Sequence, residues 1–385
     1  MGGTRPKALR SFNYERVGTI GANTAKIILF DPEWDKIEGL LQNGGWRNIE
    51  LQYGYTTGLR SPKYKLVLMG YLPTFSVDGC TLDLTCISAG FHLSPKVPRL
   101  KSKTWGDKRI SEIVEDICGE NGWAAEVDRT QEVYDNHDLE ESGLVRAHFT
   151  QNKLSDLQFI AEVLQPRAIR EKDKAGDYRL FFDDATNKLH FHPPTYDKGP
   201  EKIYTYRMER TSEVISWQPR VDGFARILRG AGVSALPYVD TQTGDYGNSE
   251  FNDADTPEKT LLGGQFTITS QKEEEFYHAV EGRPVRDKDQ ADAIARSRYY
   301  TELNDVYGGV LEIVGDPSRL PGTNIKILVL KPNGALHYTT GLYHIMKITD
   351  SMSSGVFKST LELQRNAFSA QSGVTGDPGT GKVNN

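Results

Sequence analysis

The 385-residue chain has few cysteines, no long apolar run and no excess of basic residues. Cys80, Cys86 and Cys118 form neither a disulfide framework nor a zinc-binding pattern, so we expect three small core side chains. Without an apolar run of about 18 residues, we expect no membrane-spanning helix and no membrane insertion. A formal net charge of −6 excludes a basic nucleic-acid footprint over the whole chain and leaves only local patches open.

Sequence signatures of catalysis are also missing. The chain contains neither G-x-S-x-G nor H-E-x-x-H, and no cysteine and histidine share a recognisable catalytic context. We therefore expect no catalytic residue, no metal ligand, no cofactor-binding residue and no cofactor. Residues 1–18 lack the apolar stretch of a secretory signal, which predicts a protein that stays, at least initially, in the cell that makes it.

The stretch GDPGTGKV at residues 376–383 resembles a phosphate-binding loop. Gly381 and Lys382 fit the rule, in which backbone N–H groups surround phosphates and the lysine reaches the terminal ones. Val383 stands where a Ser or Thr would hold magnesium, and no helix can follow in the two remaining residues. We interpret residues 367–385 as a flexible Gly-rich tail, because its small polar residues bury too little apolar surface to order it.

Two pairs of residues have ligand-like spacing. His190 and His192 would point to the same face of a strand, a possible metal-ligand spacing, but the sequence places no third ligand, so we favour a solvent-facing or partly packed pair. Asp253 and Asp255 resemble the start of a calcium loop without its glycine or its terminal glutamate. We interpret them, and the three consecutive glutamates at 273–275, as solvated acidic side chains.

Period-two alternation dominates residues 1–100. Four segments rich in β-branched and aromatic residues are separated by Gly, Pro, Asp and Asn, at residues 25–30, 46–55, 63–72 and 80–88. This pattern predicts a first small antiparallel barrel or sandwich.

Residues 101–200 change to a helical period and back. Apolar residues recur on one helical face in RISEIVEDICGENGW. A second helix is predicted in SDLQFIAEVLQP, where Ser155 and Gln158 form a capping box and Pro166 ends the helix. The segment DYRLFFDDATNKLHFHPP alternates around a turn and predicts a hairpin. Together these elements predict a separate α+β domain.

Strands return in residues 201–366. The segment EVISWQPRVDGFARILRGAGV is followed by a long polar arm at about 234–286, and then by a helix predicted at 287–303 with a capping box at Asp287 and Gln290. Four strand-like segments close the pattern: GGVLEIVG, NIKILVL, LYHIMKITD and FKSTLELQRN.

The first and last segments repeat one order of features. NIEL is followed by MGYLPTFS and TLDL, just as NIKI is followed by TGLYHIMKI and TLEL, with Gly70 and Gly341 aligned. The repeat predicts two copies of one barrel. The expected fold is therefore mostly β with an α+β insertion: two tube-like β-barrel domains flanking an α+β domain.

The C-terminal block resembles the closing domain of phage baseplate hub proteins, the family of late control protein D and the hub part of type VI spike proteins. The resemblance rests on a helix feeding a strand that ends in Gly315-Asp316-Pro317, a Pro321-Gly322 turn, Gly341 with Tyr343, and the final TLELQRN. ISEIVEDICGENGW and SDLQFIAEVLQPRA resemble the family's insertion domain, so the resemblance covers about residues 105–366.

Members of that family form trimers in which each chain contributes two tube-like barrels, so that six barrels form a ring below a sixfold tail tube. The resemblance implies a non-enzymatic, trimeric baseplate hub of a tailed phage or related contractile particle, located in the virion tail and assembled in the host cytoplasm. It also implies several partners: the tail tube protein, a trimeric spike protein, other baseplate proteins, and the tape-measure protein or DNA passing transiently through a central channel.

One departure and two alternatives remain. No lysozyme-like or spike β-helix region follows, so we expect a piercing tip or cell-wall enzyme to be another protein. The first alternative is a peptidoglycan or polysaccharide hydrolase with β-rich accessory domains, although none of the 52 acidic residues is placed as a catalytic pair. The second is a nucleotide-driven motor that uses residues 376–382.

Overall fold

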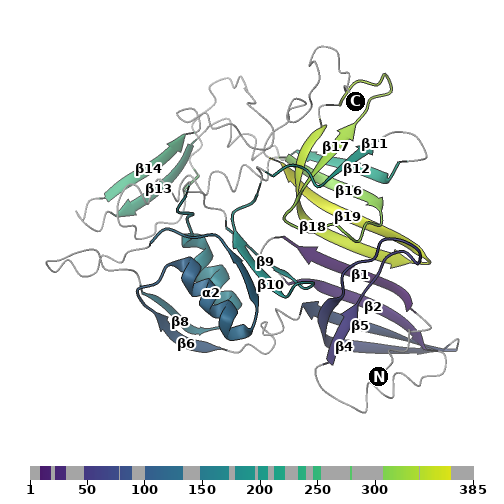
Figure 1. The fold of residues 1–385 in the computed structure, drawn as a ribbon, viewed down its shortest axis with the longest axis horizontal. Helices are drawn as coiled ribbons and strands as arrows, with labels where there is room; N and C mark the ends of the chain where they lie inside the picture. Colours follow the sequence, from purple (N-terminus) through teal and green to yellow (C-terminus); the bar gives the residue numbers. More distant parts are fainter. Residues whose placement is uncertain are drawn as a thin grey trace.

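Strands make up most of the described part of the chain (Figure 1). The computed structural model describes residues 9–18, 22–31, 47–77, 79–88, 100–132, 148–172, 178–195, 198–206, 212–221, 233–239, 246–252, 278–279, 307–337 and 339–365. Within these ranges no helix is both long and apolar enough to cross a membrane. The predicted fold class, mostly β with an α+β insertion, is confirmed.

Among the described residues, eleven strands from both ends of the chain form one large sheet. The N-terminal strands are β1 (Leu9–Val17), β2 (Thr24–Asp31), β3 (Arg47–Leu51), β4 (Tyr64–Ser76) and β5 (Gly79–Ser88). The C-terminal strands are β11 (Lys202–Tyr206), β12 (Val214–Val221), β16 (Tyr307–Val314), β17 (Asn324–Val329), β18 (Gly341–Ser353) and β19 (Val356–Arg365). The order is β12-β16-β19-β18-β1-β2-β5-β4-β3, with β17 paired to β18 and β11 paired to β17.

The two halves of this sheet repeat one antiparallel strand order. In the first half the order is β1-β2-β5-β4-β3, and in the second it is β12-β16-β19-β18-β17. Thr74 lies opposite Thr81 just as Thr349 lies opposite Thr360. Strands β4 and β18 each carry a bulge, where the register shifts between Leu68 and Gly70 and between Ile345 and Lys347. The predicted duplication is therefore confirmed in strand order and pairing.

One detail of the predicted repeat is wrong. Gly70 lies inside β4, opposite Thr85, whereas Gly341 is the first residue of β18. A glycine in an alternating segment marks either the start of a strand or a bulge within one, and only the pairing distinguishes these cases.

Strand β1, which was not among the strands expected from the sequence, joins the two repeats. It pairs with β2 on one side and with β18 on the other, where Ser11 lies opposite Ser353 and Val17 opposite Lys347. Its alternate residues Phe12, Tyr14 and Arg16 are buried. Two of these inward positions are aromatic and the third is an arginine, so the alternation of this strand is only partly apolar.

The α+β unit contains both predicted helices. Its helical elements are α2 (Ile110–Asn121), α3 (Asp156–Gln158), the π-helix η2 (Phe159–Leu164) and the 3₁₀-helix η3 (Gln165–Arg167). Helix α2 ends at Gly122, which adopts a left-handed φ of 70°. The predicted capping box is confirmed, because Ser155 Oγ accepts from the Gln158 N–H and Gln158 Oε1 accepts from the Ser155 N–H, both at 3.2 Å. Pro166 lies in the final 3₁₀ turn.

Two small sheets complete this unit. One pairs β6 (Lys101–Trp105) with β8 (Phe149–Leu154), and the other has the order β7 (Ala124–Val127), β10 (Lys188–His192), β9 (Arg179–Asp183). The predicted hairpin is β9–β10. Strand β7 runs parallel to β10, which places Glu126 opposite His190. Figure 1 shows α2 beside these strands, and the unit shares one buried apolar cluster.

Part of the predicted polar arm is folded. Strands β13 (Val233–Val239), β14 (Tyr246–Asn252) and β15 (His278–Ala279) form a three-stranded sheet. The rest of the arm, the helix predicted at 287–303 and the tail after residue 366 lie outside the described residues.

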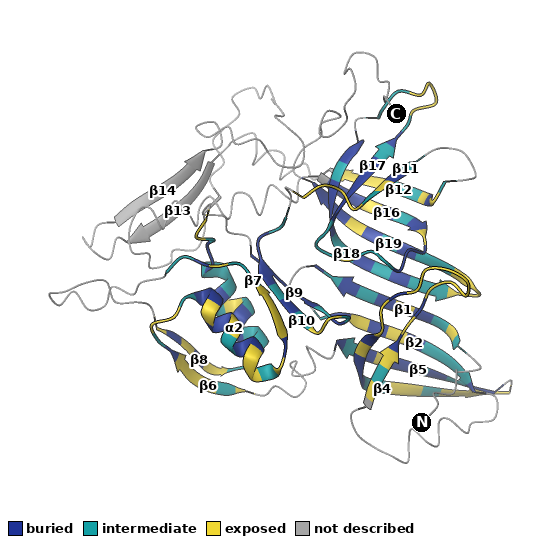
Figure 2. Ribbon diagram, in the orientation of Figure 1, coloured by how far each residue is buried: buried dark blue, intermediate teal, exposed yellow. Residues whose placement is uncertain are grey.

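Most buried apolar residues of the described ranges fall into three clusters, and Figure 2 shows buried positions in the α+β unit and in both repeats of the sheet. One cluster fills the α+β unit, and each repeat of the large sheet surrounds a cluster of its own. Three separate cores support a division into three units, while boundaries at about residues 100, 200 and 366 remain predictions.

Candidate functional site

A cavity of about 390 Å³ opens where the α+β unit meets the large sheet. Its lining includes Arg16 and Tyr64 of the first repeat, Asp184 and His190 of the β9–β10 hairpin, and Asn324 of β17. Residues from all three units therefore converge here, and several of them are polar.

The turn of the β9–β10 hairpin places a buried carboxylate against the first repeat. Asp184 accepts hydrogen bonds from Tyr14 Oη at 2.8 Å, from Asn23 Nδ2 at 2.9 Å and from Ser88 Oγ. Burial raises the pKa of Asp184 to about 6, although these three donors favour the ionised form. Asp184 thus holds the insertion unit on the first repeat.

A buried ion pair connects the first repeat to the second. Arg16 Nη2 lies 2.6 Å from Asp350 Oδ2, and the two side chains are 3% and 0% exposed. Tyr53 Oη and Ser359 Oγ each donate to the Asp350 carboxylate at 2.5 Å. Arg16 also donates to Tyr64 Oη at 3.0 Å. The pair is therefore hydrogen-bonded on both sides, as buried charges require.

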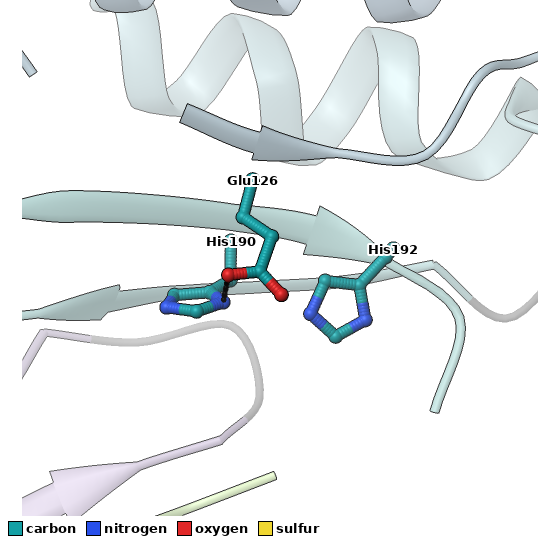
Figure 3. A group of neighbouring side chains, drawn as sticks. All are labelled: Glu126, His190 and His192. Atoms are coloured by element: carbon teal, nitrogen blue, oxygen red, sulfur yellow. Dashed lines mark ion pairs between the residues drawn. The ribbon is translucent and has the colours of Figure 1, made fainter. Parts of the chain in front are cut away.

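Glu126, His190 and His192 converge at one side of the cavity (Figure 3). One potential ligand atom from each lies within 4.8 Å of the other two. His190 Nδ1 is 3.6 Å from Glu126 Oε2. The spacing of the two histidines was visible in the sequence, but the proximity of Glu126 was not, because it depends on the parallel pairing of β7 with β10.

Burial and neighbouring charges shift the pKa values of His190 and Glu126. Burial lowers the pKa of His190 to about 4, and its ring stacks on Phe181 with centroids 4.4 Å apart. Burial alone would raise the pKa of Glu126, but the hydrogen bond from Lys188 and the nearby histidines lower it. Lys188 Nζ lies 3.1 Å from Glu126 Oε2.

A different candidate surface is the open edge of the first repeat. Strand β18 pairs with β19 on one side, and its other side pairs first with β17 and then with β1. The corresponding strand β4 pairs with β5 and, over Tyr64–Leu68, with β3. Within the described ranges, Tyr71–Thr74 thus has a neighbouring strand on one side only, and Leu72 is 64% exposed. At the other end of the sheet, β12 pairs only with β16 among the described strands.

The remaining positions singled out in the sequence are the three cysteines, two acidic stretches and the glycine-rich loop near the end. Cys80, Cys86 and Cys118 are free and buried, as expected of core residues. Burial raises the pKa of Cys86 to about 11 and that of Cys118 to about 12, so both stay protonated thiols near neutral pH. Asp253, Asp255, the glutamates at 273–275 and the loop at 376–383 lie outside the described residues.

No family model matches the chain, and no curated protein matches it in sequence. Solved structures match it over most of its length. A tail protein from Neisseria meningitidis MC58 has a TM-score of 0.58 at 9% identity, with 95% of each chain covered. The 43 kDa tail protein of prophage MuSo2 from Shewanella oneidensis has a TM-score of 0.52 at 9% identity, covering 93% of this chain and 94% of that chain.

A third similar structure comes from E. coli and is described as a component of the type VI secretion system with similarity to T4 bacteriophage tail proteins. Its TM-score is 0.53 at 13% identity, with 94% of this chain and 74% of that chain covered. The chain therefore has the fold of phage tail proteins, and the resemblance predicted from the sequence is confirmed at the level of fold.

Proposed function

We propose that the protein is a structural, non-enzymatic hub of the tail baseplate of a tailed phage or related contractile particle, and that three chains form a ring. The tail-protein fold supports the class of protein. The observation that carries the ring is the repeated sheet with two open ends.

Within one chain, β1 of the first repeat pairs with β18 of the second. The equivalent contact between two chains would join β12 of one chain to β4 of the next. In the described sheet β12 has a free side, and β4 has one over Tyr71–Thr74, beyond its pairing with β3. Pairing β12 of one chain with β4 of the next would repeat between chains the contact that β1 and β18 make within a chain. Such a contact joins two different surfaces of neighbouring chains. It produces a closed ring when the rotation from one chain to the next is a whole fraction of a full turn.

Three chains in such a ring present six similar repeats. This number matches a sixfold tail tube on one side and a threefold spike on the other, so we propose the tube protein and a trimeric spike as partners. Other baseplate proteins would surround the ring, and the tape-measure protein or DNA would pass through its channel. The residues of the 234–286 arm and of the tail are candidates for contacts with these neighbours. The protein would assemble in the host cytoplasm and remain in the virion tail.

The solution mass, measured by light scattering over a range of concentrations, tests the ring directly. We expect three chains per particle, alone or after co-expression with the cognate spike. A chain that stays monomeric under both conditions contradicts the ring. A peptidoglycan turbidity assay tests the non-enzymatic role, which would be wrong if clearing occurred and one carboxylate substitution abolished it.

A further inference from the structure

We propose that Glu126, His190 and His192 form a zinc-binding site facing the cavity between the α+β unit and the large sheet. The site does not depend on the proposed hub function, because it lies within the α+β unit of a single chain. Its three residues come from only two strands, β7 and β10.

Backbone pairing brings the ligands together. His190 and His192 are two residues apart on β10, so their side chains leave the same face of the strand. The parallel register places Glu126 of β7 opposite His190. A rigid two-strand platform of this kind limits how far each ligand can move before metal arrives.

The ring of His192 is oriented as a metal ligand. Its Nδ1 lies 2.8 Å from the Pro193 carbonyl oxygen, which can only accept, so Nδ1 carries the hydrogen. Nε2 is then left with a free lone pair, and Figure 3 shows this nitrogen on the side of the ring nearer the Glu126 carboxylate. A carbonyl that accepts from the distal ring nitrogen is the usual second partner of a zinc-bound histidine.

His190 provides an independent indication. Its Nδ1 is buried and has no hydrogen-bond partner among the described residues. In Figure 3 this nitrogen points at Glu126, 3.6 Å from Oε2, which is too long for a hydrogen bond. A buried polar atom without a partner costs free energy, and a metal ion between His190, His192 and Glu126 would remove that cost.

The donor set selects the metal. Two imidazole nitrogens and one carboxylate suit zinc, whereas magnesium and calcium prefer oxygen ligands. Zinc bonds are about 2 Å long, so binding would draw the three atoms closer, chiefly through the flexible Glu126 side chain. Since all three residues line the cavity of about 390 Å³, a fourth position remains open to water or to a ligand from a partner.

Lys188 competes with the metal. Its ammonium lies 3.1 Å from the same Glu126 oxygen that faces His190, so its positive charge opposes a second cation at this carboxylate. Removal of this charge should therefore tighten metal binding, an outcome that a purely structural trio would not produce.

The test uses the full chain, freed of metal by chelation and titrated with Zn²⁺ by calorimetry. We expect one equivalent to bind, and we expect Co²⁺ to give the visible absorption of a tetrahedral site. His190→Ala and Glu126→Gln should each weaken Zn²⁺ binding by at least about tenfold, equivalent to about 1.4 kcal/mol. Lys188→Met should strengthen it several-fold, and His148→Ala, which removes a histidine outside the trio, should leave it unchanged.

Circular dichroism establishes that each variant is folded, and Glu126→Gln preserves the size of the side chain. The absence of saturable binding at micromolar Zn²⁺ in the wild-type chain would overturn the proposal. So would equal binding by the wild type and by the His190→Ala, His192→Ala double variant.

Discussion

Arg16 and Asp350 occupy the point where the two sheet repeats meet. Arg16 lies on β1 and Asp350 on β18, and the carboxylate also accepts from Tyr53 and Ser359. Because both charges are almost fully buried, each depends on the other for compensation. The ion pair therefore favours the observed register between β1 and β18, because a shifted register would separate the two buried charges.

We predict that Arg16→Met or Asp350→Asn alone lowers the free energy of unfolding by about 3–5 kcal/mol, because each leaves the partner buried without its counter-ion. The double variant should lose less than the sum of the two. Urea denaturation measures all three. The exposed pair Lys63–Glu50, whose side chains are 65% and 59% exposed, provides the control. Lys63→Met should cost less than about 1 kcal/mol, and equal losses in the buried and exposed pairs would contradict this account.

Asp184 makes stability depend on pH in a defined direction. Its pKa in the folded protein is about 6, raised from 3.8, so between these values the folded state holds a proton that the unfolded state has released. Its contribution to stability therefore falls as pH rises from about 4 to about 6, and is constant outside that window. The full effect is about 3 kcal/mol, at 1.36 kcal/mol per pKa unit.

The measurement is the urea midpoint of the wild type minus that of Asp184→Asn, at several pH values from 3.5 to 7. We expect this difference to decrease between about pH 4 and pH 6. The change of this difference with pH is informative, whereas its absolute size is not. Asparagine cannot accept from all three donors, so the variant is destabilised at every pH. A difference that is flat across this window would show that Asp184 is not the titrating group.

Among the described strands, β18 pairs with the largest number of neighbours, namely β19, β17 and β1. Gly341 starts this strand at a φ of 155°, and a Cβ there would collide with the Arg365 guanidinium. Arg365 is itself fully buried and donates to the Thr340 carbonyl at 3.0 Å. The glycine is thus required both for its backbone conformation and for space.

We predict that Gly341→Ala destabilises the protein by about 1–3 kcal/mol more than Gly334→Ala, because only the first adds a collision in a packed region. Gly334 also has a positive φ, 79°, but a Cβ there meets nothing within 4 Å. The two variants differ in backbone conformation, with φ 155° at Gly341 and 79° at Gly334, and only Gly341→Ala adds the contact with Arg365. Thermal or urea unfolding compares them, and equal losses would show that Arg365 moves aside at little cost.

For the chain as a whole, the open edge at β4 should govern assembly. We predict that the double substitution Leu72→Lys and Thr74→Lys reduces the trimeric fraction in light scattering without lowering the unfolding temperature, because charged side chains on an edge strand oppose pairing. Val356→Lys is the matched control, since Val356 is 56% exposed but lies at the β18–β19 turn. Loss of trimer in both variants would point to a general charge effect.

The sequence predicted most of the strands and both helices of the insertion. Alternation located β2, β4, β5 and the β9–β10 hairpin, and a capping box at Ser155 marked the start of the second helix. It did not predict β1, whose inward positions include a charged residue, or β13 and β14, whose alternation is weak. It also missed the short strands β6, β7, β8, β11 and β15. At the candidate metal site it found His190 and His192 but not Glu126.

Local periodicity and turn residues determine where a strand or helix forms, because neighbouring side chains along the chain set those preferences. The succession of most strand-forming segments along each repeat was therefore readable from the sequence. Which strands pair across long distances depends on contacts between residues far apart in the chain. The joining of β1 to β18 through Arg16 and Asp350, the placement of Glu126 beside two histidines, and the open edge of β4 arise only when the whole sheet is assembled.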